Sequence, residues 1–407
     1  MNATIKRPSK DTYQDLFSFG GLIAVAALLF LNARYGIGNE DQSLYLSITL
    51  RLTMGDSLLT DDWTMIQLSS FLLYLPVKLY LAVFGSTDGI VLFFRYLFIV
   101  MQGTTAAVIY ALLRNRGIVS VWAALIFFSY VPVTIMAVSY YTMGLVFVEV
   151  VALLFLTAKS QSKGRFFIAG ICVAGAVLCN PLYALLYFAY SLFVLRSETK
   201  KRNGNAKVSF SEVAFQKGTW ARLTLGILVM VSLFSLFVLT RADIKNILAN
   251  LPYIFQDPDY VFAGEGQNVI NITQSLLGVA RYGYHLVVVF AGVMISLLLD
   301  KKRYRHRPLY AGIVSVIFLI LMIHILRSSV VSDLWGLYTG ATGQNFTMPT
   351  LALMLPLTLL GLTCYCLTEN KEKGIFVFLW LHGIVYTVFL DITSDFAPWN
   401  SMQGLAV

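Results

Sequence analysis

Long runs of mainly apolar residues recur along this 407-residue chain, with short basic segments between them. Hydrophobic residues make up 58% of the sequence and charged residues 13%, whereas soluble domains usually carry about 25% charged residues. No ordinary core could hide this much apolar surface, so lipid must cover much of it. The runs are unbroken rather than alternating, which predicts an all-α, polytopic integral membrane protein instead of a β-barrel.

Eleven of these runs are predicted to be transmembrane helices in a single domain over residues 1–407. The first follows a polar, basic stretch and lacks a clear small-residue cleavage site after it, which predicts an uncleaved helix and a cytoplasmic N-terminus. The predicted spans are 16–33, 90–113, 118–137, 140–158, 166–180, 182–196, 223–240, 284–299, 309–326, 348–368 and 374–390.

A twelfth apolar run, residues 67–84, decides the orientation of everything after it. If it does not cross, the cytoplasmic segments hold 22 of the 30 Lys and Arg residues; if it crosses, the distribution reverses. Cytoplasmic loops of membrane proteins are enriched in Lys and Arg. The run also contains Pro76 and Lys78. We therefore predict that 67–84 dips into or lies on the outer face.

The distribution of charge also limits the function. The net charge is +9, but the basic residues form short clusters between spans, which is an orientation signal rather than a nucleic-acid surface. The topology leaves two large outer segments, 34–89 and 241–283, and a basic cytoplasmic loop, 196–222. The four cysteines all lie within apolar runs and are expected to be buried, without disulfides.

Acidic residues gather in the first outer segment. Glu40 and Asp41 stand just outside the first span, and Asp61 and Asp62 follow about 20 residues later. A hydrated loop would also account for this composition. Residues 43–52, between the two pairs, fit either one helix face or an alternating strand.

The order of residues in this segment resembles the GT-C membrane glycosyltransferases, especially their protein O-mannosyltransferase and aminoarabinose-transferase branch. Asp41 with Tyr45, then Gly55, then Asp61-Asp62-Trp63 match the order of that family's first outer loop. Two departures are plain. The acidic pair reads Glu-Asp rather than Asp-Glu, and the usual Pro-Pro after the Trp is absent. The resemblance is specific over residues 39–117 and architectural elsewhere.

The resemblance implies juxtamembrane helices on the outer face and transfer of a sugar from a polyprenyl-phosphate carrier in the bacterial cytoplasmic (inner) membrane. The acceptor would be a cell-envelope glycan, lipid or protein. Asp41, or Glu40 in its place, would be the base that accepts the acceptor's proton, which inverts the anomeric configuration. Asp61, Asp62, Trp63 and Tyr45 would orient the acceptor or hold a divalent cation, Mg²⁺ or Mn²⁺.

Basic residues on the outer side oppose the positive-inside rule and are candidates for holding the carrier phosphate. Arg281 and Arg327 are the preferred pair, and His285 and His324 lie near the same level. Side chains that snorkel from helix ends to the interface are the alternative. All four candidate cations stand at predicted outer helix ends: Arg241, Lys245, Arg281 and Arg327.

A non-enzymatic transporter or flippase of lipid-linked sugars is the rival hypothesis. That class concentrates polar residues at mid-membrane, often in repeated halves. Here the charge within the spans is nearly limited to Glu149, for which a hydrogen bond to a neighbouring helix is the alternative role. An accessory scaffold subunit is a third possibility. The carboxylates on the outer side favour the enzyme.

Overall fold

The computed structural model describes residues 10–35, 41–131 except 63 and 65, 135–157, 163–191 except 186 and 189, 217–250, and the single residues 252 and 383. The elements below belong to one compact unit, made of residues 1–205 and 213–257. Within the described residues every regular element is helical, which confirms the all-α prediction there. The four predicted spans after residue 283 lie outside these ranges.

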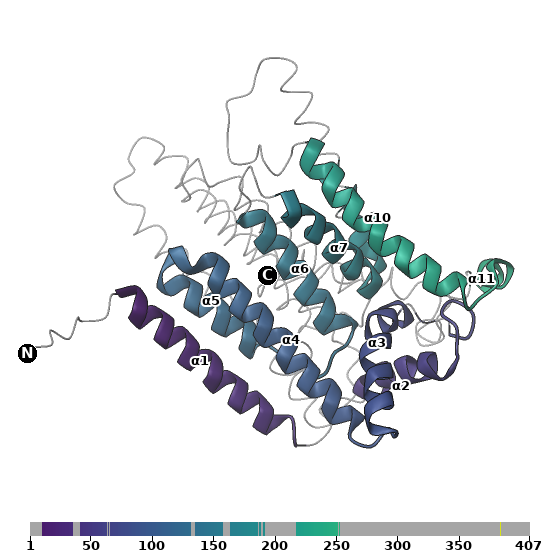
Figure 1. Cartoon of the computed structure of the whole chain (residues 1–407), viewed down its shortest axis with the longest axis horizontal. Helices are drawn as coiled ribbons and strands as arrows, with labels where there is room; N and C mark the ends of the chain where they lie inside the picture. Colours follow the sequence, from purple (N-terminus) through teal and green to yellow (C-terminus); the bar gives the residue numbers. More distant parts are fainter. Residues whose placement is uncertain are drawn as a thin grey trace, which may run out of the picture. The chain divides into compact units, whose positions relative to one another are not determined.

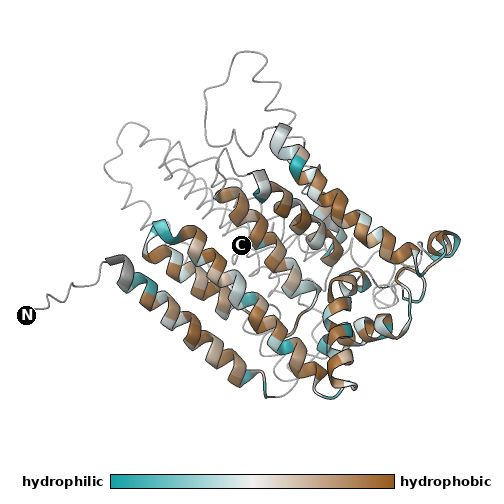
Figure 2. Ribbon diagram, viewed as in Figure 1, coloured by the Kyte–Doolittle hydropathy of each residue, from teal (hydrophilic) through white to brown (hydrophobic). Residues whose placement is uncertain are grey.

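Four of the described helices are long and apolar enough to cross a membrane (Figure 2). They are α1 (Lys10–Asn32), α3 (Gln67–Phe84), α4 (Ile90–Leu113) and α10 (Lys217–Leu239). Large apolar side chains of α1, such as Leu16, Phe19 and Leu28, are more than half exposed. Such a surface suits lipid rather than water. The chain is therefore a membrane protein with several apolar helices.

Helices α1 and α4 are antiparallel (Figure 1), because contacts tie both of their ends together. At one end, Gln14 Nε2 donates to the carbonyl of Gly117, 3.1 Å away, and Asp15 forms an ion pair with Arg114. At the other end, Arg95 Nη1 donates to the carbonyl of Ala33 at 2.7 Å. The segment between these helices therefore begins and ends at the same end of the pair.

That segment forms two helices, α2 (Asp41–Met54) and α3. With 14 residues, α2 is about 20 Å long and cannot cross a hydrocarbon core of about 30 Å. Helix α3 packs chiefly on α2 and α7 and meets α4 only near their junction, where Tyr80 and Phe93 stack at 4.8 Å. A crossing α3 would pack along α4 as a hairpin. The geometry therefore supports the prediction that 67–84 does not cross, although its length would allow it.

The predicted span 118–137 is not one helix, so this prediction was wrong in detail. Helix α5 (Ile118–Ser129) ends after three turns, and the described residues that follow, up to Ser139, are not helical. Pro132 in the sequence cannot supply a helical N–H. Gln102 Nε2 of α4 donates to the carbonyls of Phe127 and Tyr130 at 2.8 and 2.5 Å. Unpaired backbone groups inside a membrane are costly, so this amide makes the break possible.

The remaining helices continue to alternate in direction. Helix α6 (Tyr140–Leu156) begins at a capping box on Ser139, beside the start of α4, and α7 (Lys163–Cys179) returns. A short 3₁₀ turn, η3 (Pro181–Tyr183), leads to residue 191 near the start of α10, where Trp220 Nε1 donates to Ser191 Oγ. Helix α10 then runs beside α7 and ends before α11 (Ile244–Asn250). Cys172 and Cys179 are buried free thiols, as expected.

Candidate functional site

The α2–α3 segment brings the first acidic pair and a buried arginine to one place. Asp41 is the first residue of α2, where the helix dipole favours a negative group. The neighbouring side chain, Gln42, is 5% exposed and accepts a hydrogen bond from Arg95 Nη2 at 3.1 Å. Glu40 and the side chain of Asp41 lie outside the described residues. The start of α2 is thus held against α1 and α4 by a guanidinium.

Arg95 is an unusual residue for this position because it is only 6% exposed. Its guanidinium donates to the Ala33 carbonyl and to Gln42, and among the described residues no carboxylate pairs with it. Its Nε, and Gln42 Nε2 beside it, have no hydrogen-bond partner. A buried charge is costly unless it is compensated. Within the described residues these two donors lack acceptors, which creates a local preference for an anionic group near the start of α2.

Tyr45 lies in a packed interface rather than on an open surface. Its side chain is 4% exposed and its ring meets that of Tyr140 on α6 edge-on at 5.3 Å. One turn later, Thr49 Oγ1 donates to Ser70 Oγ at 3.2 Å and joins α2 to α3. Through these contacts Tyr45 and Thr49 hold α2 against α6 and α3, and a contact of Tyr45 with an acceptor stays a prediction.

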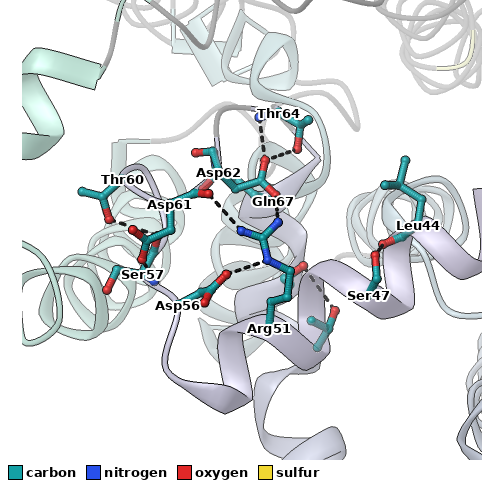
Figure 3. A network of polar contacts seen from close by, with 12 residues as sticks. Leu44, Ser47, Arg51, Asp56, Ser57, Thr60, Asp61, Asp62, Thr64 and Gln67 are labelled. Carbon is teal, nitrogen blue, oxygen red and sulfur yellow. Dashed lines mark hydrogen bonds and ion pairs between the residues drawn. The ribbon is translucent and has the colours of Figure 1, made fainter.

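The second acidic pair sits in the loop between α2 and α3, around Arg51 (Figure 3). Arg51 Nε donates to Asp56 Oδ2 at 2.6 Å, and Nη2 donates to the carbonyl of Asp61 at 3.0 Å. Nη1 lies 3.5 Å from Asp62 Oδ2. One guanidinium from the last turn of α2 therefore gathers three loop residues.

The carboxylates of this pair are also engaged within the loop. Asp61 Oδ2 accepts from the amide of Ser57 at 2.6 Å. Asp62 Oδ1 accepts from both the amide and the hydroxyl of Thr64 at 2.9 Å. Asp61 is exposed and Asp62 is half-buried, and Trp63 lies outside the described residues. The carboxylates shape the loop, and the exposed Asp61 faces solvent.

The structure separates the two acidic pairs. Asp41 begins α2 and Arg51 stands ten residues later in its last turn, a helical rise of about 15 Å. A single reacting atom cannot touch both ends of α2. If both pairs act on one substrate, that substrate must be extended, with its reacting group near Asp41 and another portion near the loop.

Arg241, one of the predicted phosphate ligands, lies at the end of α10 against the same segment. Nη1 donates to the carbonyl of Leu52 at 3.2 Å, and Nη2 donates to the Tyr74 hydroxyl at 2.6 Å. The guanidinium stacks over the rings of Tyr74 and Phe237, at 4.5 and 4.1 Å from their centroids. The Arg241 carbonyl accepts from Ser57 Oγ at 3.0 Å. Arg241 thereby joins the end of α10 to α2, to α3 and to the loop between them.

A second cation approaches the same phenol oxygen. Lys78 Nζ, on the exposed side of α3, donates to the Tyr74 hydroxyl at 2.9 Å. Two positive charges therefore lie close together, and neither forms an ion pair with a described carboxylate. Like charges in proximity repel, so an anion beside them would be stabilised. Lys245 is exposed on α11, while Arg281, Arg327, His285 and His324 lie outside the described residues.

The predictions missed the contributions of Arg51, Gln67, Lys78 and Arg95. Gln67 closes the loop from the start of α3, accepting from the amide of Leu59 at 2.6 Å and donating to the carbonyl of Asp62 at 2.7 Å. The signal for the three cations was present: each is an exception to the positive-inside rule in the predicted topology. Gln67 carried no such signal.

A divalent cation was one of the predicted ligands of this segment. Within the described residues no three His, Cys, Asp or Glu side chains are grouped so that they could hold one. Oxygens of Asp56, Asp61 and Asp62 in the loop face the guanidinium of Arg51. Comparison of the whole chain with protein-family models, curated proteins and solved structures gives no match.

Proposed function

We propose that this protein is a glycosyltransferase of the GT-C type. It would move a sugar from a polyprenyl-phosphate carrier to a cell-envelope acceptor on the outer face of the bacterial cytoplasmic membrane. The observation that carries the proposal is the antiparallel pairing of α1 with α4. It brings the whole acidic segment, with its two helices, to one end of the spans.

The distribution of basic residues supports an outer location for that end. Arg114, just after α4, and Arg165, in the first turn of α7 against the end of α6, lie at the opposite end, and Lys and Arg mark the cytoplasmic side. The proposed topology has a cytoplasmic N-terminus and eleven crossings. Seven of these fall before residue 250, and four are assigned to the sequence after it.

In the proposed reaction, the Asp41 or Glu40 carboxylate accepts the proton of the acceptor hydroxyl. The hydroxyl oxygen forms a bond to the anomeric carbon from the side opposite the carrier. The bond between that carbon and the phosphate oxygen breaks, and the phosphate keeps the electron pair, which inverts the configuration. Arg241, together with Lys78, supports binding of the negative leaving group. The buried guanidinium of Arg95 favours the ionised form of a nearby carboxylate.

The test is sugar transfer by the purified full chain from a set of synthetic polyprenyl-phosphate sugars, comparing wild type with Asp41→Asn and Glu40→Gln. Loss of the base should reduce turnover by about 10²-fold or more in one of the two variants. Asp88→Asn is the matched control, since Asp88 is an exposed carboxylate in the same outer segment. Full turnover in both acidic-pair variants would exclude this pair as the source of the base.

Glu149 is the observation that favours a flippase as the alternative. Its side chain is buried in α6, with Oε2 lacking a partner, and ionisable groups inside membranes commonly mark transport paths. A flippase would move lipid-linked sugars across proteoliposomes, and Glu149→Gln would slow this movement while Asp41→Asn would not. The glycosyltransferase proposal expects sensitivity at Asp41 instead.

A further inference from the structure

Arg51 joins the α2–α3 loop through its backbone as well as its side chain. The amides of Gly55 and Asp56 both donate to the Arg51 carbonyl at 3.1 Å. Gly55 has a φ of 127°, a conformation that glycine adopts without strain. The chain therefore turns sharply at Gly55. The loop comes back over the guanidinium of Arg51 (Figure 3).

The groups around this guanidinium are those that a hard divalent cation would use. Two carboxylate oxygens, from Asp56 and Asp62, and the carbonyl oxygen of Asp61 face it at 2.6 to 3.5 Å. Mg²⁺ and Ca²⁺ are bound by carboxylate and carbonyl oxygens. A guanidinium offers donors spread across a plane and so can serve several oxygens at once.

The rest of the loop is closed around this arrangement. Asp61 and Asp62 accept further hydrogen bonds from Ser57 and Thr64. Leu59 takes a φ of 67°, which side-chain-bearing residues rarely adopt, and its amide is held by Gln67. A cation that displaced Arg51 would have to break this network, because the same oxygens cannot serve both.

From this geometry we infer that Arg51 takes the place of a divalent cation in the acidic loop. Its single charge offsets part of the charge of three carboxylates, and its planar donors set the positions of Asp61 and Asp62. The loop then keeps its shape without Mg²⁺ or Mn²⁺, contrary to the sequence-based expectation for this pair. This inference goes beyond the proposed function, since it concerns how the loop is held whatever reaction takes place beside it.

The experiment uses the full chain in detergent, with Mn²⁺ binding followed by electron paramagnetic resonance and thermal stability measured with EDTA or with millimolar Ca²⁺. With Arg51 present, Asp62→Asn should bind as much Mn²⁺ as wild type does. Ca²⁺ should not raise the thermal unfolding midpoint of wild type. Arg51→Met should lower the midpoint by about 2 °C or more and regain part of that loss in Ca²⁺. It should also gain Mn²⁺ binding that a second substitution, Asp62→Asn, removes.

Lys245→Met is the matched control because it removes one exposed positive charge that forms no ion pair with a carboxylate of the described residues. It should show neither the Ca²⁺ response nor the Mn²⁺ gain. Arg51→Lys tests the inference if Arg51→Met does not fold, since a compact ammonium cannot serve all three oxygens. Its midpoint in EDTA should fall below that of wild type. The inference would be overturned if wild type bound Mn²⁺ and Asp62→Asn abolished that binding. It would also be overturned if Arg51→Lys and Arg51→Met kept the wild-type midpoint.

Discussion

Helices α7 and α10 approach each other closely at Gly170 and Gly226. A Cβ atom added at Gly170 would stand 2.0 Å from the carbonyl oxygen of Leu223 and 3.0 Å from the Cα of Gly226. A Cβ at Gly226 would meet the Phe167 carbonyl at 2.1 Å. Small residues allow such approach between membrane helices. Gly170→Ala should therefore separate two helices that now touch backbone to backbone.

The size of the effect follows from these distances. Cβ contacts below 3.0 Å are essentially never seen, so α7 and α10 must move apart by about 1 Å, because backbone atoms cannot rotate away as a side chain can. A gap of that size forfeits a quarter to a half of the dispersion energy at each contact. Overpacking typically costs about 1–3 kcal/mol, and the rigid walls here place Gly170→Ala at about 3 kcal/mol.

Unfolding of the purified protein by SDS titration would measure the loss. Gly164→Ala is the control: Gly164 lies in the first turn of the same helix, with no atom within 4 Å of an added Cβ. It should match or slightly exceed wild-type stability, since alanine is the better helix former. The displaced α10 carries Arg241, so Gly170→Ala should also reduce sugar transfer. Equal stability of the two variants would refute the backbone contact.

The other predictions concern topology and buried polar groups. In a cysteine-free background, Asn115→Cys should resist membrane-impermeant maleimide in intact cells and Ser86→Cys should react, and the opposite pattern would reverse the topology. Gln102→Leu should cost about 1–3 kcal/mol by leaving the Phe127 and Tyr130 carbonyls without their donor, measured in SDS unfolding against Val100→Leu, a change at an exposed apolar position of the same helix. Arg95→Met should destabilise by a similar amount, because it leaves the Ala33 carbonyl and the Gln42 side chain without their donor, and a stability equal to wild type would show that this guanidinium is dispensable.

Much of the topology could be predicted from the sequence, because lipid imposes a simple requirement on length and composition. Five of the first seven predicted spans match helices of the described residues, with their ends shifted: 16–33, 90–113, 140–158, 166–180 and 223–240. The predicted span 118–137 breaks after Ser129, and only part of 182–196 is described. The exclusion of 67–84 rested on the count of basic residues and on Pro76 and Lys78 within the run. The contacts of Arg95 with Ala33, and of Gln14 with Gly117, support it independently.

The break after Ser129 could not be read from the sequence with the same ease. Its cost depends on whether a polar side chain from elsewhere reaches the freed carbonyls. Gln102 lies 25 residues earlier along the chain than its first partner, Phe127. Periodicity reports one helix at a time, so it cannot reveal a hydrogen bond between two helices. The helix or strand ambiguity of 43–52 had the same origin, and packing of α2 on α3 resolves it as helix.

The candidate site gives a different lesson about sequence signals. The acidic pairs were the first candidates. Their spacing along the sequence did not reveal that they lie at opposite ends of α2, whose rise from Asp41 to Arg51 is about 15 Å. The cations on the outer side were the more specific signal. A Lys or Arg there opposes the orientation of the chain, so it must be retained for another reason. Six such residues lie in the described unit, and four of them donate to acceptors in or beside α2 and α3: Arg51, Lys78, Arg95 and Arg241.

In the proposed topology, this concentration of bonds would hold the segment on one face although α3 is long and apolar enough to cross. Drawing α3 through the bilayer would pull Lys78 and the Tyr74 hydroxyl away from Arg241, and it would part Thr49 from Ser70. Each broken contact would leave a polar or charged group in hydrocarbon. The cations therefore disfavour a topology in which α3 crosses the bilayer. The same hydrogen bonds hold the acidic loop in place. A variant that weakens them should lose orientation and site geometry together.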